Sequence, residues 1–224
     1  KKNFIVEGNI NHKKIDLNEK NLDLFIKPFL PDFEIEKLLF SSNNIFSFNL
    51  NQGFKIENFK VNSDITIDKF TFINNLNLKK FLPKIKKTIS LSENKISLSH
   101  KKNDIYINGK GNISFQDKID NISYDLKMKN KALNFEASFK TNKNPFKIDP
   151  LNYEKSENSN LDISLKGSKD KNGKILIRSL NLKEDKNKIA LKDLGFNKNF
   201  EIAELKDVYL DYTDKENQKN LLEL

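Results

Sequence analysis

The chain has 224 residues, of which 37% are hydrophobic and 32% charged. This composition is too apolar for a disordered chain, and the length allows one or two domains with a substantial core. Cys is absent, which excludes disulfide frameworks and thiolate metal sites. The net charge of +9 comes from lysines interleaved with 31 acidic residues, and Arg178 is the sole arginine. A nucleic-acid interface needs a basic stripe, so we expect no nucleic-acid partner.

The chain starts at Lys1, and we expect it to be a processed chain or an internal fragment, with any targeting or anchoring segment outside it. Its apolar runs stop at lengths such as Leu38–Phe40. A helix that spans a bilayer needs about 20 apolar residues. The sequence therefore predicts no membrane span within this piece.

Residues 1–90 contain an internal repeat, in which a run of alternating apolar residues recurs at an offset of 55 (59 − 4 = 55). Each copy predicts two strands followed by a short amphipathic helix, and the two units cover about 4–31 and 59–83. The matched strand residues are Phe4, Val6, Ile10, Ile15 and Leu17, and then Phe59, Val61, Ile65, Phe70 and Phe72. The helix residues are Leu22, Phe25, Ile26 and Phe29, and then Leu78, Phe81, Leu82 and Ile85. These helices would pack on a sheet or, alternatively, act as lids or membrane-surface contacts.

Residues 91–224 alternate between apolar and polar with a period of two, which predicts an antiparallel β-meander with one apolar face. The clearest runs lie at 105–115, 122–128, 133–139 and 161–165. Asp170–Gly173 separates the last of these from Ile175 and Ile177, and its Asn-Gly pair predicts a hairpin turn. The whole chain is expected to form one continuous β unit.

Gly109-Lys110-Gly111 interrupts one of these runs and raises the alternative of a phosphate-binding loop. Such a loop needs a helix directly after the glycines, but alternation resumes at Ile113 and Phe115. Both glycines share the parity of Ile107 and Ile113. We therefore expect them to lie in a curved or bulged strand.

No catalytic constellation is visible in the sequence. His12 and His100 each lie among lysines in an expected surface turn, without further metal ligands at a suitable spacing. The carboxylate pairs Glu184/Asp185 and Asp211/Asp214 also lie among lysines and are expected to be solvated. The sequence predicts a protein that is not an enzyme and that carries no cofactor or metal.

Three segments resemble the AsmA-like family, the TamB/YhdP-type bridge-like lipid transport proteins. They are IYINGKGNISF (105–115), IDNISYDLKMKNKALNFEASF (119–139) and the segment from Gly173 to Asp214. The similarity extends over about residues 50 to 215. It implies a periplasmic fragment, tethered to the inner membrane by an anchor outside this piece. It also implies that the piece conducts phospholipid acyl chains between inner and outer membrane, or supports outer-membrane assembly.

The expected fold is mostly β: a long curved antiparallel meander sheet that forms an open apolar groove, with one or two short amphipathic helices. The apolar face must be covered by a second sheet, by helices or by a ligand. A closed β-sandwich without a lipid site, serving as an envelope or interaction domain, is the alternative. A basic surface that docks on nucleic acid or anionic membrane is a third possibility. The candidate lipid-binding residues are Ile105, Ile107, Ile113, Phe115, Ile122, Tyr124, Leu126, Met128, Phe135, Phe139, Ile163, Leu165, Ile175 and Ile177.

Overall fold

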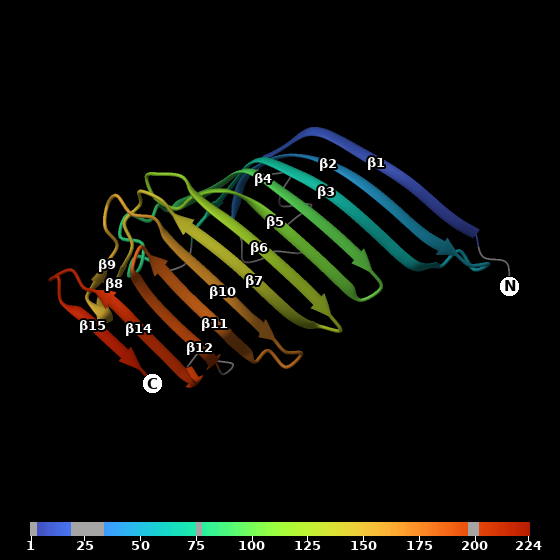
Figure 1. Cartoon of the computed structure of the whole chain (residues 1–224). Helices are drawn as coiled ribbons and strands as arrows, with labels where there is room; N and C mark the ends of the chain where they lie inside the picture. Colours follow the sequence, from blue (N-terminus) through green and yellow to red (C-terminus); the bar gives the residue numbers. More distant parts are fainter. Residues whose placement is uncertain (1–3, 19–33, 75–77, 197–201) are drawn as a thin grey trace.

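The computed structural model describes residues 4–18, 34–74, 78–196 and 202–224. Thirteen strands form one antiparallel sheet in the order β1-β2-β3-β4-β5-β6-β7-β10-β11-β12-β14-β15, with β13 paired to β12 (Figure 1). The N-terminal strands are β1 (Phe4–Asn18), β2 (Ile35–Leu50), β3 (Ile56–Ile73), β4 (Thr88–Lys101), β5 (Asp104–Ser114), β6 (Asp120–Lys129) and β7 (Ala132–Thr141). The C-terminal strands are β10 (Leu161–Lys169), β11 (Ile175–Glu184), β12 (Asn187–Phe196), β13 (Ile202–Glu204), β14 (Asp207–Thr213) and β15 (Lys219–Glu223). The expected long antiparallel meander is confirmed, and the sheet is not closed into a barrel.

Directly paired residues of antiparallel strands lie on the same face of a sheet. We call the face that carries the rows of paired apolar residues the apolar face. Rows of paired residues cross the strands, and bulges shift the register in places such as Gly167 of β10. One such row, from β5 to β12, is Ile107, Leu126, Phe135, Gly167, Ile177 and Leu194. The next residues along the chain, such as Asn108 and Lys127, point to the opposite, polar face.

Bulges bend the long N-terminal strands. In β1 the register with β2 shifts between His12 and Ile15, and Lys14 has a left-handed φ of 46°. In β3 the register with β2 shifts at Asp68, which is an extra residue opposite β2. A bulge bends its strand and increases the local twist. Figure 1 shows β1, β2 and β3 arching over part-way along their length.

Each copy of the sequence repeat forms one bulged strand, so the expectation of two strands per copy is wrong. The bulge absorbs the polar pair Lys13 and Lys14, and the chain therefore keeps its direction instead of turning back. Asp68 lies 55 residues after Lys13 (68 − 13 = 55), which is the offset of the repeat. The bulge consequently falls at the same place in both copies.

The second expected helix, at Leu78–Ile85, is also wrong, since these residues form successive turns. The amides of Phe81 and Leu82 bond the carbonyl of Leu78, at 2.9 and 2.8 Å, but the pattern stops at Pro83, which has no N–H to extend it. The first expected helix, with Leu22, Phe25, Ile26 and Phe29, lies outside the described residues. Among the described residues the only helical element is the 3₁₀ turn η1 (Asp149–Leu151).

The buried core lies at one end of the strands. There the turns at 78–85, the small sheet of β8 (Lys147–Ile148) and β9 (Tyr153–Glu154), and η1 fold over the apolar face (Figure 1). The core residues are Leu82, Phe146, Tyr153, Leu161, Leu182, Ile189 and Tyr212. Tyr212 donates a hydrogen bond to the carbonyl of Leu151 at 2.7 Å, which ties β14 to this cover. We call this part of the apolar face the covered end.

Two glycines of the apolar face, Gly109 and Gly167, make room for aromatic rings from the neighbouring strand. Gly109 is paired with Tyr124, and a Cβ on Gly109 would lie 2.3 Å from Cζ of that tyrosine. A Cβ on Gly167 would likewise lie 2.7 Å from Cζ of its partner Phe135. Each ring therefore lies across the backbone of the next strand. Gly109 and Gly111 are strand residues, as expected, and no helix follows them.

The hairpin expected at Asp170–Gly173 is confirmed. Gly173 has a φ of 88°, and its amide bonds the carbonyl of Asp170 at 3.0 Å. The Asp170 carboxylate accepts hydrogen bonds from the amides of Asn172 and Lys174. The turn joins β10 to β11, as the Asn-Gly pair predicts.

We predict that Gly109→Val lowers the free energy of unfolding by about 1–3 kcal/mol, because its side chain would overlap the Tyr124 ring. Urea unfolding of the single variants and of Gly109→Val with Tyr124→Ala measures the coupling between the two positions. The valine should be less costly once the ring is removed. Additive effects of the two substitutions would contradict the packing described above.

Candidate functional site

All fourteen candidate residues from the sequence lie on, or directly after, strands of the single sheet. Thirteen are strand residues whose pairings place them on the apolar face. Phe115 follows β5, and its ring packs edge-on against Phe139 with centroids 5.5 Å apart. Ile113 and Ile177 are buried, and the other twelve are only partly buried. The described residues therefore leave much of this face uncovered.

The covered end divides the candidate residues into two groups. Phe115 and Ile163 pack against its buried core. The candidates nearer the hairpin tips are partly buried and do not belong to this core; they include Ile107, Leu126 and Met128. Only this second group lies on apolar sheet surface that remains open to a ligand.

An apolar hollow lies on the same face of β1, β2 and β3. Its volume is ≈ 840 Å³, within the size range of small-molecule sites. It is lined by Ile10, His12, Ile15, Leu17, Leu38, Phe40, Ser42, Asn44, Phe46, Phe48, Phe59, Val61 and Ile65. We call it the N-terminal cavity.

Sequence reasoning did not assign a site to the N-terminal cavity. The repeat identified Ile10, Ile15, Leu17, Val61 and Ile65 as strand residues but gave them no ligand. The signal that could have identified it is the alternation from Leu38 to Leu50 in β2. Ser42 and Asn44 interrupt that alternation, and they obscure it in the sequence.

A small polar cluster lies inside the N-terminal cavity. Ser42 Oγ is 3.1 Å from Nδ1 of His12 and accepts a hydrogen bond from Nδ2 of Asn44 at 3.0 Å. The same amide nitrogen donates to the carbonyl of Ile10 at 3.1 Å. Apolar side chains lie to either side of this cluster along the strands. The arrangement suits an amphipathic ligand, with polar atoms at the cluster and hydrocarbon beside it.

The expectation that both histidines lie in surface turns is wrong. His12 is a partly buried residue of β1 that lines the N-terminal cavity. His100 is a partly buried residue of β4, and its ring centroid is 5.9 Å from that of Phe59. The lysines that flank each histidine suggested a turn. In the structure Lys13 and Lys14 lie in the β1 bulge, and Lys101 is still a residue of β4.

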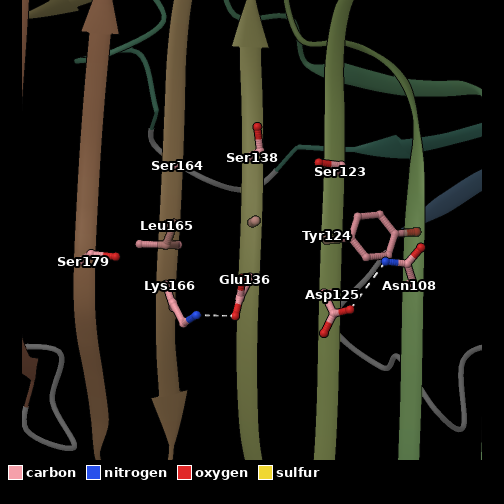
Figure 2. A pocket seen from close by; sticks show the side chains of 11 residues that line it. Asn108, Ser123, Tyr124, Asp125, Glu136, Ser138, Ser164, Leu165, Lys166 and Ser179 are labelled. Carbon is pink, nitrogen blue, oxygen red and sulfur yellow. Dashed lines mark hydrogen bonds and ion pairs between the residues drawn. The ribbon is translucent and has the colours of Figure 1, made fainter.

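The polar face carries a smaller hollow of ≈ 360 Å³ (Figure 2). Ser123, Ser138 and Ser164 are paired across β6, β7 and β10, and their short side chains leave this depression. Beside it Lys166 forms an ion pair with Glu136 at 2.6 Å. These groups neutralise one another at the surface, and they offer no apolar environment that would activate an acid or a base.

Glu184 is a buried carboxylate of the covered end, with 2% of its surface exposed, and the expectation that it is solvated is wrong. It accepts hydrogen bonds from the Tyr153 hydroxyl at 2.6 Å, the Ser156 amide at 2.7 Å and the Ser159 hydroxyl. Burial alone would raise the pKa of Glu184, but these hydrogen bonds outweigh it and hold the pKa below its usual value.

The Glu184 cluster joins parts of the cover to the sheet. Buried Lys155 donates to the carbonyls of Ser156 and Ser159, each at 2.8 Å. Asp120 accepts from Nδ2 of Asn144 at 2.7 Å, yet its burial raises its pKa. Every one of these contacts links the 142–160 segment to a strand or to itself. We assign the cluster a structural role. The other three carboxylates of the expected pairs, Asp185, Asp211 and Asp214, are exposed or partly buried.

Within the described ranges, no group of three or more His, Asp or Glu side chains is arranged to hold a metal ion. Nor does any described helix have the length and apolarity needed to cross a membrane. Comparison with protein-family models, with curated proteins and with solved structures gave no match to this chain.

We predict that Glu184→Gln lowers the free energy of unfolding at neutral pH by about 1–3 kcal/mol, because a charged acceptor of several hydrogen bonds is lost. The folded-state pKa of Glu184 is depressed, so its contribution is present above the usual pKa of a glutamate and is lost as pH falls through the folded-state value. The difference between the native protein and the variant should therefore shrink in acid. Denaturant unfolding across pH measures it, and a difference that is constant or grows toward low pH would contradict this role.

Proposed function

We propose that the protein is a non-enzymatic segment whose apolar sheet face binds lipid acyl chains. The observation that carries the proposal is the N-terminal cavity, an uncovered hollow of ≈ 840 Å³ lined mainly by aliphatic and phenylalanine side chains. A soluble protein rarely leaves a large continuous apolar surface uncovered unless that surface binds something. An acyl chain is a ligand that matches this lining without specific polar partners.

The cavity is continuous with the rest of the apolar face. Val61 of the cavity pairs with His100 of β4, and His100 pairs with Ile105 of β5. Ile105 pairs in turn with Met128 of β6. A ligand that leaves the cavity across the strands therefore meets further partly buried apolar side chains. This continuity supports movement of lipid along the sheet as well as storage at one place.

The expected affinity follows from hydrocarbon burial. Each CH₂ group removed from water contributes about 0.8 kcal/mol, so ten groups contribute about 8 kcal/mol. Association costs about 4–15 kcal/mol in lost translational and rotational freedom, which is of the same order as that gain. Binding should therefore strengthen with chain length and should remain reversible, as transfer requires.

The resemblance to the AsmA-like family extends the proposal to the setting of the protein. In that setting the segment lies in the periplasm, tethered to the inner membrane, and passes phospholipid between the inner and outer membranes or supports outer-membrane assembly. The open curved sheet and the lack of a visible catalytic constellation in the sequence are consistent with it. The membrane anchor would lie outside the described residues.

The closed β-sandwich that the sequence left open does not fit the described residues. A sandwich needs two sheets of similar size, but thirteen strands belong to one sheet, and the second sheet consists only of β8 and β9. An interaction domain without lipid remains an outcome of the experiment below.

We predict that Phe48→Asp abolishes lipid binding and leaves the protein folded. Phe48 lines the uncovered cavity, where a carboxylate stays hydrated until lipid arrives. Native mass spectrometry of protein purified from cells measures lipid occupancy, and thermal unfolding measures stability.

Two matched variants complete this experiment. Ser47→Asp places the same charge one residue away on the polar face and should retain lipid. Leu161→Asp places it in the dry core of the covered end and should unfold the protein. Native protein that carries no lipid, or Phe48→Asp that carries as much as the native protein, would refute the proposed function.

A further inference from the structure

The end of the strands opposite the covered end presents a row of hairpin tips. Since successive strands are antiparallel, the start of β1 and the turns after β2, β4, β6 and β10 all lie at this same end (Figure 1). We call these residues the open rim. It consists of Phe4, 51–56, 101–104, 129–131 and 169–174. The described part of the β12–β14 connection lies at the same end but is not included, because its Lys206 is paired with Asp193 and Glu204.

Large apolar side chains protrude from the open rim beside the N-terminal cavity. Leu50 pairs with Phe4 on one side and with Ile56 on the other, so the apolar face continues to the very end of β1, β2 and β3. Phe4 is 67% exposed and Ile56 is 60% exposed. Phe54, in the turn beyond them, is 83% exposed. This is an unusual place for aromatic surface on a protein surrounded only by water.

The turn that carries Phe54 is held in shape by Asn51. The side-chain oxygen of Asn51 accepts hydrogen bonds from the amide of Gly53 at 2.9 Å and from the amide of Lys55 at 3.1 Å. Its carbonyl accepts the amide of Phe54 at 3.0 Å. These bonds fix the turn with Phe54 projecting from it, so the exposed ring is part of a defined local structure.

The rest of the open rim is basic. It carries eight lysines and two acidic residues, Asp104 and Asp170, a net charge of +6 (8 − 2 = 6). The lysines are Lys55, Lys101, Lys102, Lys129, Lys131, Lys169, Lys171 and Lys174. All eight are exposed, and none forms an ion pair with another described residue.

The covered end differs from the open rim in degree, because several of its charges are paired and several of its apolar side chains are buried. There Lys84 and Lys86 lie within 4.0 Å of Asp117, and Lys147 pairs with Asp149. Its apolar residues Leu82 and Phe146 are buried against the sheet. Lysines without an ion pair, such as Lys79 and Lys80, also occur at the covered end, but apolar side chains protrude further from the open rim. Phe54 is 83% exposed at the rim, whereas Ile119 at the covered end is 56% exposed and Phe81 42%.

We infer that the open rim docks on an anionic bilayer surface. Exposed Phe and Ile side chains insert at the level of the headgroups, and lysines near them are attracted to anionic lipids. The rim supplies both groups in one row, with Phe4, Phe54 and Ile56 adjacent to the lysines. Docking in this orientation brings the end of the apolar face at Leu50 against the membrane. A lipid chain then enters the N-terminal cavity at this edge, a step that rests on the proposed function, whereas docking does not.

Vesicle flotation tests the docking. The probes are vesicles of phosphatidylcholine alone and vesicles of phosphatidylcholine mixed with phosphatidylglycerol, at low and high salt. We expect binding to the anionic vesicles only, with a loss at high salt. Phe54→Ser should weaken binding, and Lys101→Ala with Lys102→Ala should weaken it by about fivefold for each lysine removed. These side chains are exposed, so both variants should unfold at the same temperature as the native protein.

Two control variants come from the other end of the strands. Ile119→Ser removes an apolar side chain that is 56% exposed, and Lys79→Ala with Lys80→Ala removes two exposed lysines. Both should bind vesicles like the native protein. Equal weakening by rim and control variants, or no binding to anionic vesicles, would overturn the docking. The docking would also be overturned if sedimentation showed that the protein self-associates through Phe54 while it binds no vesicle.

The cavity variant separates docking from lipid uptake. Phe48→Asp should still float with anionic vesicles but carry no lipid, whereas Phe54→Ser should lose flotation and still bind lipid supplied in detergent. If Phe48→Asp retains its lipid while the rim variants lose flotation, the proposed function fails and the docking stands. If flotation is unchanged in the rim variants while Phe48→Asp loses its lipid, the docking fails and the proposed function stands.

Discussion

The structure depends on a single constraint: a period-two sequence in an antiparallel meander puts its apolar side chains on one face of one sheet. Such a face is unstable in water unless something covers it. Among the described residues, the chain provides a cover only at one end, through Leu82, Phe146 and Tyr153. The hydrogen-bonded Glu184 helps to hold that cover in place. The uncovered remainder is the surface to which we assign lipid, and its existence follows from the scarcity of covering elements in the described residues.

Curvature determines what the uncovered face can hold. The bulges at Lys14 and Asp68 bend β1 and β3 at equivalent positions, and the hollow between these strands is the N-terminal cavity. Glycines contribute in another way, since rings such as Tyr124 lie across Gly109 instead of standing upright on the sheet. A flat sheet with upright rings would offer separate gaps between side chains. The bent sheet offers a continuous apolar surface that ends at the basic open rim.

The sequence predicted the fold where alternation is unbroken and failed where it is interrupted. From Ile122 to Phe139 each strand has a clean period of two, so its direction, partner and apolar face could all be inferred. Lys13 and Lys14 suggested a turn, because a bulge and a turn begin with the same local interruption. Glu184 appeared solvated because its partners Tyr153 and Ser159 lie 25 or more residues away. Only the folded chain brings them to it. The N-terminal cavity was missed because Ser42 and Asn44 interrupt the alternation of β2.

Photo-crosslinking in cells tests most directly whether the apolar face carries lipid. A photoreactive amino acid is placed at three positions of the apolar face and at their neighbours on the polar face. The apolar positions are Phe48, Leu126 and Leu165, and the polar ones are Ser47, Lys127 and Lys166. Lipid binding along the sheet predicts lipid adducts from all three apolar positions and from none of the polar ones. Protein adducts alone, or lipid adducts that do not follow the period of two, would contradict it.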